Sequence, residues 1–256
     1  MLSRRLIATT AALVTLGPLA AACGSSGPSA NGAATESPGK AETALVAAVK
    51  KAGSVHLVTT ATQSGKKVTT TIDAGRTVGR ETIHAPAGTA TILAAQKAAY
   101  LKADPSVLAS VFGLPSSEAA KVGKQWLSFP SGSTPYQSLA SGLTVGDIAK
   151  ELTASSVTRR SHADVGGTMV VTLHGKSVGG KGTLDLYVPT TGKLLPVGGK
   201  ATSSGVSVDL AFSKWGQSVS VKPPATSITL PSSPPSSTSP PSSSSPPSST
   251  SPPSST

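Results

Sequence analysis

The sequence predicts an α+β domain in which one antiparallel sheet packs its apolar face against a few helices. A helical spacing of apolar residues comes first, stretches of alternating apolar and polar residues follow, and short helical segments separate two groups of these stretches. Glycine-rich turns divide the stretches at hairpin intervals, which favours antiparallel pairing with one face in water. The folded domain is expected to span residues 41–230, a length that can bury one sizeable core.

The first element is predicted to be a helix over residues 40–53 ("KAETALVAAVKKAG"). Its apolar residues follow helical spacing, Glu42 lies in the first turn and Gly53 ends it. Strands are predicted after it wherever apolar residues recur with a period of two. These stretches are residues 54–64, 67–73, 168–174, 183–188 and 205–215.

Three short helices are predicted between the two groups of strands. Asp104 and Pro105 can cap and start one of them, and residues 116–123 ("SSEAAKVG") can form another. Thr144 with Asp147 resembles a capping box in front of the third, "VGDIAKEL". The order helix, strands, short helices, strands is that of a sheet covered by helices on its apolar face.

The chain begins with the three-part pattern of a secretory signal peptide, expected over residues 1–22. Arg4 and Arg5 form a basic start, residues 6–19 are mostly apolar, and three alanines follow. The apolar stretch is too short to span a bilayer, which takes roughly 20 apolar residues. The protein is therefore expected to be secreted across the plasma membrane.

Cys23 is the only cysteine of the chain and directly follows this pattern. The stretch "LAAAC" resembles the lipobox of bacterial lipoproteins, in which the cysteine is acylated, for example with palmitate, and becomes the first mature residue. The aliphatic residue, Leu19, stands one place further from the cysteine than is usual. The alternative is a plain secreted protein, but an exposed unpaired thiol is a liability in an oxidising compartment, and acylation removes it. We expect a lipid anchor at the outer face of the plasma membrane.

The two flanks of the domain are predicted to be unfolded. Residues 23–40 consist largely of Gly, Ser, Pro and Ala and are expected to form a flexible tether. Residues 231–256 are a disordered Pro/Ser-rich tail of low complexity, with a six-residue repeat ("PPSSTS") and no charged side chain. Neither segment contains the apolar side chains that a packed core requires.

The charge of the chain points to anionic partners. Without residues 1–22 the chain carries 20 basic and 11 acidic side chains, a net charge of +9. Outside the cytoplasm this favours phospholipid headgroups, acidic glycolipids or wall polymers, although an ordinary solvated surface also fits. The eight aromatic residues are not interleaved with basic clusters, so no nucleic acid is expected as a partner.

Four stretches resemble, in order, segments of the LppX/LprG-type lipoproteins of actinobacteria, which are similar in fold to the LolA and LolB lipoprotein carriers. They are "KAGSVHLVTTATQSGKKVTTTID", "AAYLKADPSVLASVFGLPSSEAAKVGKQWLSFP", "GKLLPVGGK" and "VDLAFSKWGQSVSVKPP". The resemblance covers roughly residues 41–225. It implies a strongly curved antiparallel sheet, a half-barrel with helices on its concave face, and an apolar cavity between them that holds or carries acyl chains.

The residues themselves favour the same kind of site. A face of Val, Leu, Ile and Met under short Ala- and Ser-rich helices has few large aromatics to fill it, although a close-packed core remains the alternative. Basic residues around the short helices, such as Lys102, Lys121 and Lys124, are expected to meet a headgroup phosphate. The residues predicted to line the cavity are Val68, Ile72, Ile83, Ile92, Leu101, Leu108, Val111, Phe112, Leu173, Leu184 and Leu186.

Two motifs that suggest catalysis lack the context they need. Residues 175–179 ("GKSVG") match the G-x-S-x-G nucleophile elbow, but a strand is predicted after Ser177 and no histidine follows His174. "HGKS" lacks the first glycine of a phosphate-binding loop, because Val170 stands there. The four histidines are far apart and no second cysteine exists, so no enzyme activity, cofactor or metal is expected.

Two functions remain open. The first is a membrane-anchored extracytoplasmic lipoprotein that binds or carries acyl-chain lipids in an apolar cavity. The second is a cell-envelope interaction protein that has a filled core and a wall-spanning Pro/Ser tail. The lipid that co-purifies with the protein distinguishes them.

The prediction for the N-terminus concerns Cys23. The mature chain is expected to begin at acylated Cys23 and to partition into detergent, because two or three acyl chains anchor a protein stably whereas one binds only with about 10⁴ M⁻¹. Cys23→Ala should release the protein or leave it unprocessed. Intact mass spectrometry and detergent partitioning measure both outcomes, and an unmodified mature chain starting at Cys23 contradicts the prediction.

Overall fold

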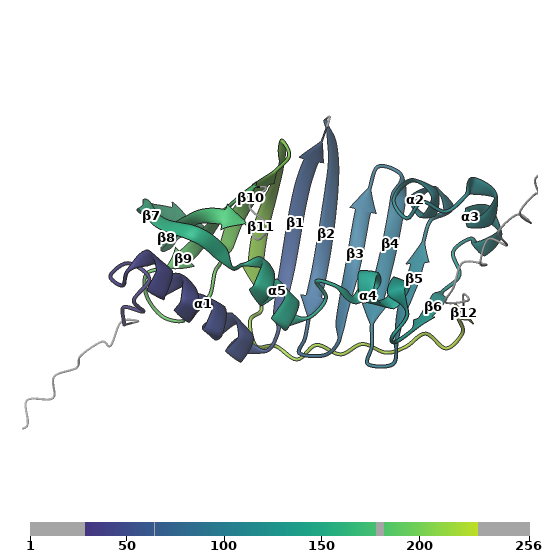
Figure 1. Ribbon diagram of the computed structural model, residues 1–256, viewed down its shortest axis with the longest axis horizontal. Coiled ribbons are helices and arrows are strands. Elements are labelled where there is room, and N and C mark those ends of the chain that lie inside the picture. The colour runs from purple at the N-terminus through teal and green to yellow at the C-terminus, as the bar shows by residue number, and fades with distance from the viewer. Residues whose placement is uncertain (1–28, 64, 178–181, 230–256) are drawn as a thin grey trace, which may run out of the picture.

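One sheet and five helices make up the part of the chain that the computed structural model describes, residues 29–63, 65–177 and 182–229 (Figure 1). The helices are α1 (Pro38–Ala52), α2 (Pro105–Ser110), α3 (Ser116–Val122), α4 (Thr134–Ala140) and α5 (Val145–Glu151). The strands are β1 (Val55–Gln63), β2 (Lys66–Ala74), β3 (Gly79–Ala85), β4 (Gly88–Ala94), β5 (Ala98–Ala103), β6 (Leu127–Pro130), β7 (Ala154–Val165), β8 (Thr168–Ser177), β9 (Gly182–Pro189), β10 (Gly198–Ser203), β11 (Val206–Ser213) and β12 (Ile228–Thr229).

The predicted α+β class is confirmed, and the sheet is almost wholly antiparallel. Its order is β12-β6-β5-β4-β3-β2-β1-β11-β10-β9-β8-β7, and β12 alone pairs in parallel, with β6. The strong curvature that the resemblance implied is not confirmed. The sheet is not strongly curled, since its strands follow one another across the whole molecule in Figure 1.

The first helix agrees with the prediction except at its beginning. Helix α1 starts at Pro38, two residues before the predicted start, and ends at Ala52. It is capped by Gly53, whose φ of 78° is in the left-handed region that glycine adopts readily. Glu42 was predicted in the first turn but lies beyond it, because the helix begins at Pro38. Its side chain is buried between α1 and β7, where Oε1 accepts a hydrogen bond of 3.2 Å from the backbone N–H of Ala154.

Part of the predicted tether packs against the domain. Ala30 forms an isolated antiparallel bridge with Thr191, and Ala33 is fully buried in the core. The flexible tether predicted as far as residue 40 is therefore wrong for residues 29–40. The predicted signal peptide, Cys23 and the predicted Pro/Ser tail lie outside the described residues.

The caps of the short helices follow two different arrangements. Thr144 and Asp147 form the predicted capping interaction of α5: the Asp147 N–H donates to Thr144 Oγ1 (3.2 Å), which itself donates to Asp147 Oδ2 (2.7 Å). Asp104 precedes α2 as predicted but makes no side-chain cap. Its carboxylate accepts instead from the backbone N–H of Thr89 (2.8 Å) and pairs with Lys124 (3.1 Å).

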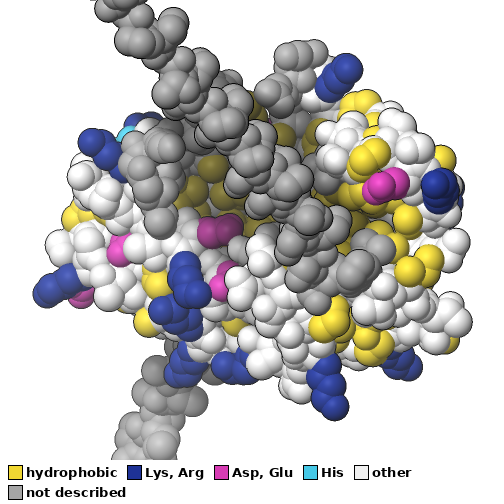
Figure 2. Space-filling model, turned by 45° about the vertical axis from the view of Figure 1, so that its right-hand side comes forward, with side chains coloured by type: hydrophobic (Ala, Val, Ile, Leu, Met, Phe, Trp, Pro, Cys, Tyr) yellow, Lys and Arg dark blue, Asp and Glu magenta, His cyan; other side chains and the backbone are white. Residues whose placement is uncertain are grey.

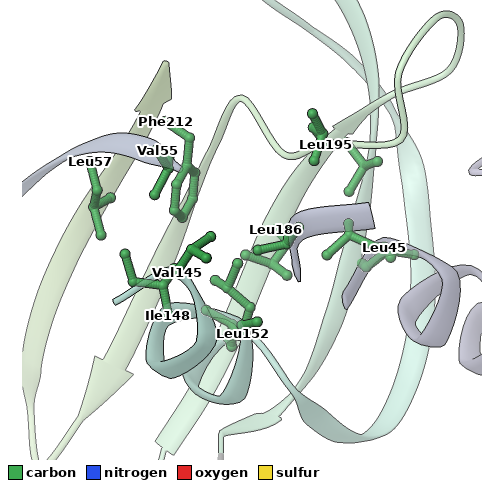
Figure 3. Close-up of a cluster of buried hydrophobic side chains, with 14 of the residues drawn as sticks. Leu45, Val55, Leu57, Val145, Ile148, Leu152, Leu186, Leu195 and Phe212 are labelled. Carbon is green, nitrogen blue, oxygen red and sulfur yellow. The ribbon is translucent and has the colours of Figure 1, made fainter. Parts of the chain in front are cut away.

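Two hydrophobic cores lie on the face of the sheet that the helices cover, which we call the inner face. The first core joins α1 and α5 to β1, β8, β9 and β11 (Figure 3). The second core joins α2 and α3 to β4, β5 and β6, with α4 packed against it. Ile72 of β2 is partly buried and contacts both cores. The inner face is therefore covered at its two ends by different helices.

The chain crosses the inner face between the two cores at residues 141–145. The Val145 N–H donates to the carbonyl oxygen of Gly75 (2.8 Å), and Thr144 forms a bridge with Gly75. A Cβ atom on Gly79 would overlap with the carbonyl oxygen of Leu143. The crossing is therefore possible because position 79 has no side chain.

The segment between β11 and β12, residues 214–227, runs past one end of the central strands (Figure 1). Trp215 stacks on Phe212 and its Nε1 donates to the carbonyl oxygen of Pro196 (3.0 Å). The Ser54 hydroxyl donates to the carbonyl oxygen of Gln217 (2.5 Å). These contacts hold the first residues of the segment, which we call the strap and which leads to β12 beside β6.

The close approach at Gly79 gives a prediction for stability. Gly79→Ala should lower the free energy of unfolding by about 3 kcal/mol, the upper end of the range for overpacking, because the backbone at Leu143 has to move. Gly39→Ala in α1 is the matched control, since nothing lies within 4 Å of the added Cβ, and it should raise the free energy of unfolding by about 0.4–1 kcal/mol, as Gly→Ala does in an unstrained helix. Urea titration measures both, and equal effects contradict the explanation.

Candidate functional site

The candidate site is the inner face of the central strands. Leu57, Ile72 and Glu81 stand side by side across β1, β2 and β3 in the register of the sheet, and Ile92 and Leu101 continue the row in β4 and β5. Residues directly opposite one another in an antiparallel sheet point to the same face. Since Leu57, Ile92 and Leu101 belong to the cores, the row lies on the inner face.

The predicted cavity residues divide between the two cores. Leu173, Leu184 and Leu186 are buried in the first core. The second core contains Ile92, Leu101 and Leu108 as buried members and Ile83 and Phe112 as partly buried ones. Ile72 contacts both cores.

Two of the predicted residues belong to neither core. Val68 of β2 is partly buried and lies on the same face as Ile72, since the two are four positions apart along the strand. Val111, the residue after α2, is 52% exposed. A larger side chain at position 111 would therefore extend over the surface and would not enter the interior.

The middle of the inner face is less covered than its ends and is apolar apart from the paired Thr59 and Thr70. Val68 of β2 is paired with Ala61 of β1, which in turn is paired with Val208 of β11, and all three are only partly buried. Figure 2 shows hydrophobic side chains gathered at a hollow between two parts of the surface. The apolar surface between the cores is thus the part of the sheet on which an apolar ligand can pack.

Glu81 places a carboxylate on this apolar face. Burial raises its pKa above the ordinary value, and the nearby carboxylate of Glu151 at the end of α5 raises it further. The pKa of Glu151, an exposed residue, is also raised, by partial desolvation and by Asp147. No cation is paired with Glu81 in the part of the chain that the structure describes. The sequence analysis missed this residue, because only the strand register places it between Ile72 and Ile92.

Cross-strand ion pairs occupy the opposite face, and they too were missed. His56 Nδ1 lies 2.6 Å from Asp73 Oδ1, and Arg80 donates to Asp73 Oδ2 at 3.0 Å. Burial alone would raise the pKa of Asp73, but the hydrogen bonds from His56 and Arg80 outweigh it and lower the pKa. His174 and Asp185 form a similar pair at 2.7 Å. These pairs join neighbouring strands on the exposed side of the sheet.

Two of the three lysines expected at the mouth of the cavity, Lys102 and Lys124, lie elsewhere. Lys102 follows Leu101 in β5, so its side chain points to the opposite face, where it lies over the ring of Trp126 at 5.8 Å. Lys124 pairs with Asp104. Both lysines line a cleft beside Trp126 and the end of the strap. They do not reach the apolar surface of the inner face.

The serine motif of residues 175–179 begins within a β-strand, and the described residues contain no metal-binding group. Ser177 ends β8, and the next described element is the antiparallel strand β9 rather than the helix that a nucleophile elbow requires. Among the described residues, no three His, Cys, Asp or Glu side chains are grouped so that they can hold a metal ion. No helix within residues 29–63, 65–177 and 182–229 has the length and apolar character to cross a membrane.

These features define an α+β domain with one open, mostly antiparallel sheet that is covered on a single face. No protein-family model matches the chain, and no curated protein matches its sequence. Solved structures that it resembles include LprF from Mycobacterium bovis, with 15% identity and a TM-score of 0.45 over 73% of this chain and 98% of that one.

Two further solved structures are similar to the same extent. LppX, a lipoprotein of Mycobacterium tuberculosis, has 14% identity and a TM-score of 0.44, and the match covers 70% of this chain and 99% of that one. An uncharacterized conserved protein from Thermus thermophilus has 10% identity and a TM-score of 0.43, over 73% of this chain and 97% of that one. The predicted resemblance to LppX-type proteins is confirmed in that LprF and LppX are among these neighbours, but such TM-scores say nothing of function.

The raised pKa of Glu81 gives a prediction for stability against pH. Its protonated form favours folding, so the contribution is complete below the ordinary pKa of 4.5 and is lost as pH rises through the raised value. Glu81→Gln should therefore raise the free energy of unfolding at pH 7 and change it little at pH 4. Glu118→Gln, on the exposed side of α3, is the control and should have no effect at either pH. Urea titration at both pH values measures the free energy of unfolding. An equal increase for Glu81→Gln at pH 4 and pH 7 would contradict the explanation.

Proposed function

We propose that the protein is a lipid-anchored extracytoplasmic protein that binds the acyl chains of a lipid on the inner face of its sheet. The observation that carries the proposal is the apolar surface between the two cores, where Val68, Ala61 and Val208 are only partly buried. The signal peptide and lipobox patterns support export and anchoring, and the LppX/LprG-type sequence segments support a lipid as the ligand.

The energetics of such a ligand need no specific polar contact. Each buried CH₂ group contributes about 0.8 kcal/mol, so ten methylenes contribute roughly 8 kcal/mol before the costs of ordering the ligand. A lipid held in this way remains bound during purification. The side chains that face it have only to be apolar and incompletely packed, as they are in the middle of the inner face.

Glu81 restricts which part of the lipid lies at this place. A phosphate close to this carboxylate would be repelled when both are charged, and Glu151 adds to the repulsion. A hydroxyl group, in contrast, can donate a hydrogen bond to Glu81. The proposal therefore places acyl chains or a hydroxyl-bearing group beside Glu81 and any phosphate farther away.

A bulky side chain in the open part of the inner face tests the proposal. Val68→Trp should reduce the bound lipid strongly while lowering the free energy of unfolding by less than about 1 kcal/mol, because it fills a space that the ligand occupies. In a close-packed core the same change costs typically about 1–3 kcal/mol. Native mass spectrometry, lipid analysis of an organic extract and denaturant titration on the same samples provide the measurements.

The control for this experiment is the same substitution at the exposed position after α2. Val111→Trp should leave both the lipid and the stability unchanged. The proposal is abandoned if the wild-type extract contains no lipid. A loss of about 1–3 kcal/mol for Val68→Trp would then favour the second function, an envelope interaction protein with a filled core.

A further inference from the structure

The start of the described chain is fixed to the connection between β9 and β10. The Gly192 N–H donates to the carbonyl oxygen of Ser29 (2.9 Å), and the Asn31 N–H donates to that of Thr190 (3.2 Å). The Asn31 side chain donates to the carbonyl oxygen of Pro189 (2.9 Å). Backbone and side-chain hydrogen bonds therefore hold residues 29–31 at this end of the domain.

The distance from this point to Cys23 is limited by the length of the chain. Five residues lie between Cys23 and Ser29, and a fully extended chain spans at most about 3.6 Å per residue, which gives roughly 20 Å. If Cys23 carries the membrane anchor, the connection between β9 and β10 has to stay within this distance of the bilayer. The inference below rests on that anchor, which is part of the proposed function.

A groove with an apolar floor and basic sides lies next to this connection. Ala48, Ala52, Leu194, Leu195 and Trp215 form its apolar part. The exposed lysines Lys51 of α1 and Lys193 of the connection are its charged members. The carbonyl oxygen of Lys193 also accepts a hydrogen bond from the Asn31 side chain (3.5 Å), so the groove directly adjoins the fixed N-terminal segment.

Two clefts continue this groove along the strap and keep its positive charge. The first cleft shares Ala52 and Gly216 with the groove, and the second shares Gln217 with the first cleft. The basic residues of the three are Lys51, Arg76, Arg80, Lys193 and Lys214. Of the described residues that line the groove and the two clefts, only Asp73 is acidic. Its carboxylate is already paired with Arg80 and His56. We call this surface the basic edge.

We propose that the basic edge is a docking surface for the anionic phospholipid headgroups of the membrane that holds the anchor. Its charge is complementary to such a surface, and each basic side chain near an anionic bilayer strengthens binding roughly five-fold. The short chain from Cys23 keeps this edge, rather than the β6 and β12 end at the right of Figure 1, close to the bilayer. The aromatic ring of Trp215 suits the interface between headgroups and acyl chains.

Vesicle binding of the mature chain without acyl groups is the first test. The chain from residue 23 with Cys23→Ser should sediment with mixed phosphatidylglycerol–phosphatidylcholine vesicles, less at high salt, and not with pure phosphatidylcholine vesicles. Lys51→Glu/Lys193→Glu should weaken this binding more than tenfold. The matched control, Lys66→Glu/Lys97→Glu, reverses two exposed lysines that do not line the basic edge and should bind almost as well as the unsubstituted chain.

The two tryptophans of the chain provide the second test, because Trp215 lies in the groove and Trp126 lies next to β6. With Trp126→Phe, a phospholipid that carries a nitroxide on its headgroup should quench the fluorescence of Trp215. With Trp215→Phe, the same lipid should leave Trp126 unquenched. Circular dichroism checks that both variants are folded.

The inference is overturned if the chain does not bind anionic vesicles, if both lysine pairs weaken binding equally, or if Trp126 is quenched as strongly as Trp215. Neither assay depends on an acyl chain at Cys23 or on lipid bound to the inner face. Failure of these assays therefore overturns the docking surface alone, while the extract and detergent-partitioning experiments test the proposed function separately.

Discussion

The arrangement of the whole domain depends on one close approach of backbone to backbone, that of Leu143 to Gly79. The helical layer has to pass from one end of the sheet to the other, and it does so where a strand carries no side chain on its inner face. Leu143 belongs to the second core and Val145 to the first. The crossing therefore determines where one core ends and the other begins, and the uncovered apolar surface beside it follows from that division.

The strands that periodicity predicted are those with one face in water. In β1, β2, β8, β9 and β11 the alternation was readable, whereas β4 and β5 have buried residues in succession, such as Leu93 and Ala94 or Ala98 and Ala99, so no alternation marks them. Helix α4 has seven residues and only partly buried apolar side chains, Tyr136, Leu139 and Ala140, so its helical spacing is too short to stand out in the sequence. Strand β7 is a polar edge strand of twelve residues.

The candidate site depends on register, which composition and spacing do not determine. The apolar residues of the inner face were predictable by type, but Glu81 among them was not, because its place between Ile72 and Ile92 follows from pairings across three strands. The same holds for His56 with Asp73, which are 17 residues apart. Val111 was misplaced because α2 ends at Ser110, one residue earlier, so its side chain points out at the end of a helix rather than inward from its middle.

The short strand β12 gives the domain a mechanical property. The described chain starts at the β9–β10 connection and ends in β12, so a pull between its two ends acts across the strands of the sheet. Neighbouring strands are about 4.8 Å apart, which separates these points of attachment by roughly 40 Å. β12 pairs with β6 through only two residues, Ile228 and Thr229. Under load β12 would detach before any other strand, and the strap could then extend. The other eleven strands of the described sheet would stay paired, and the inner face would keep its shape.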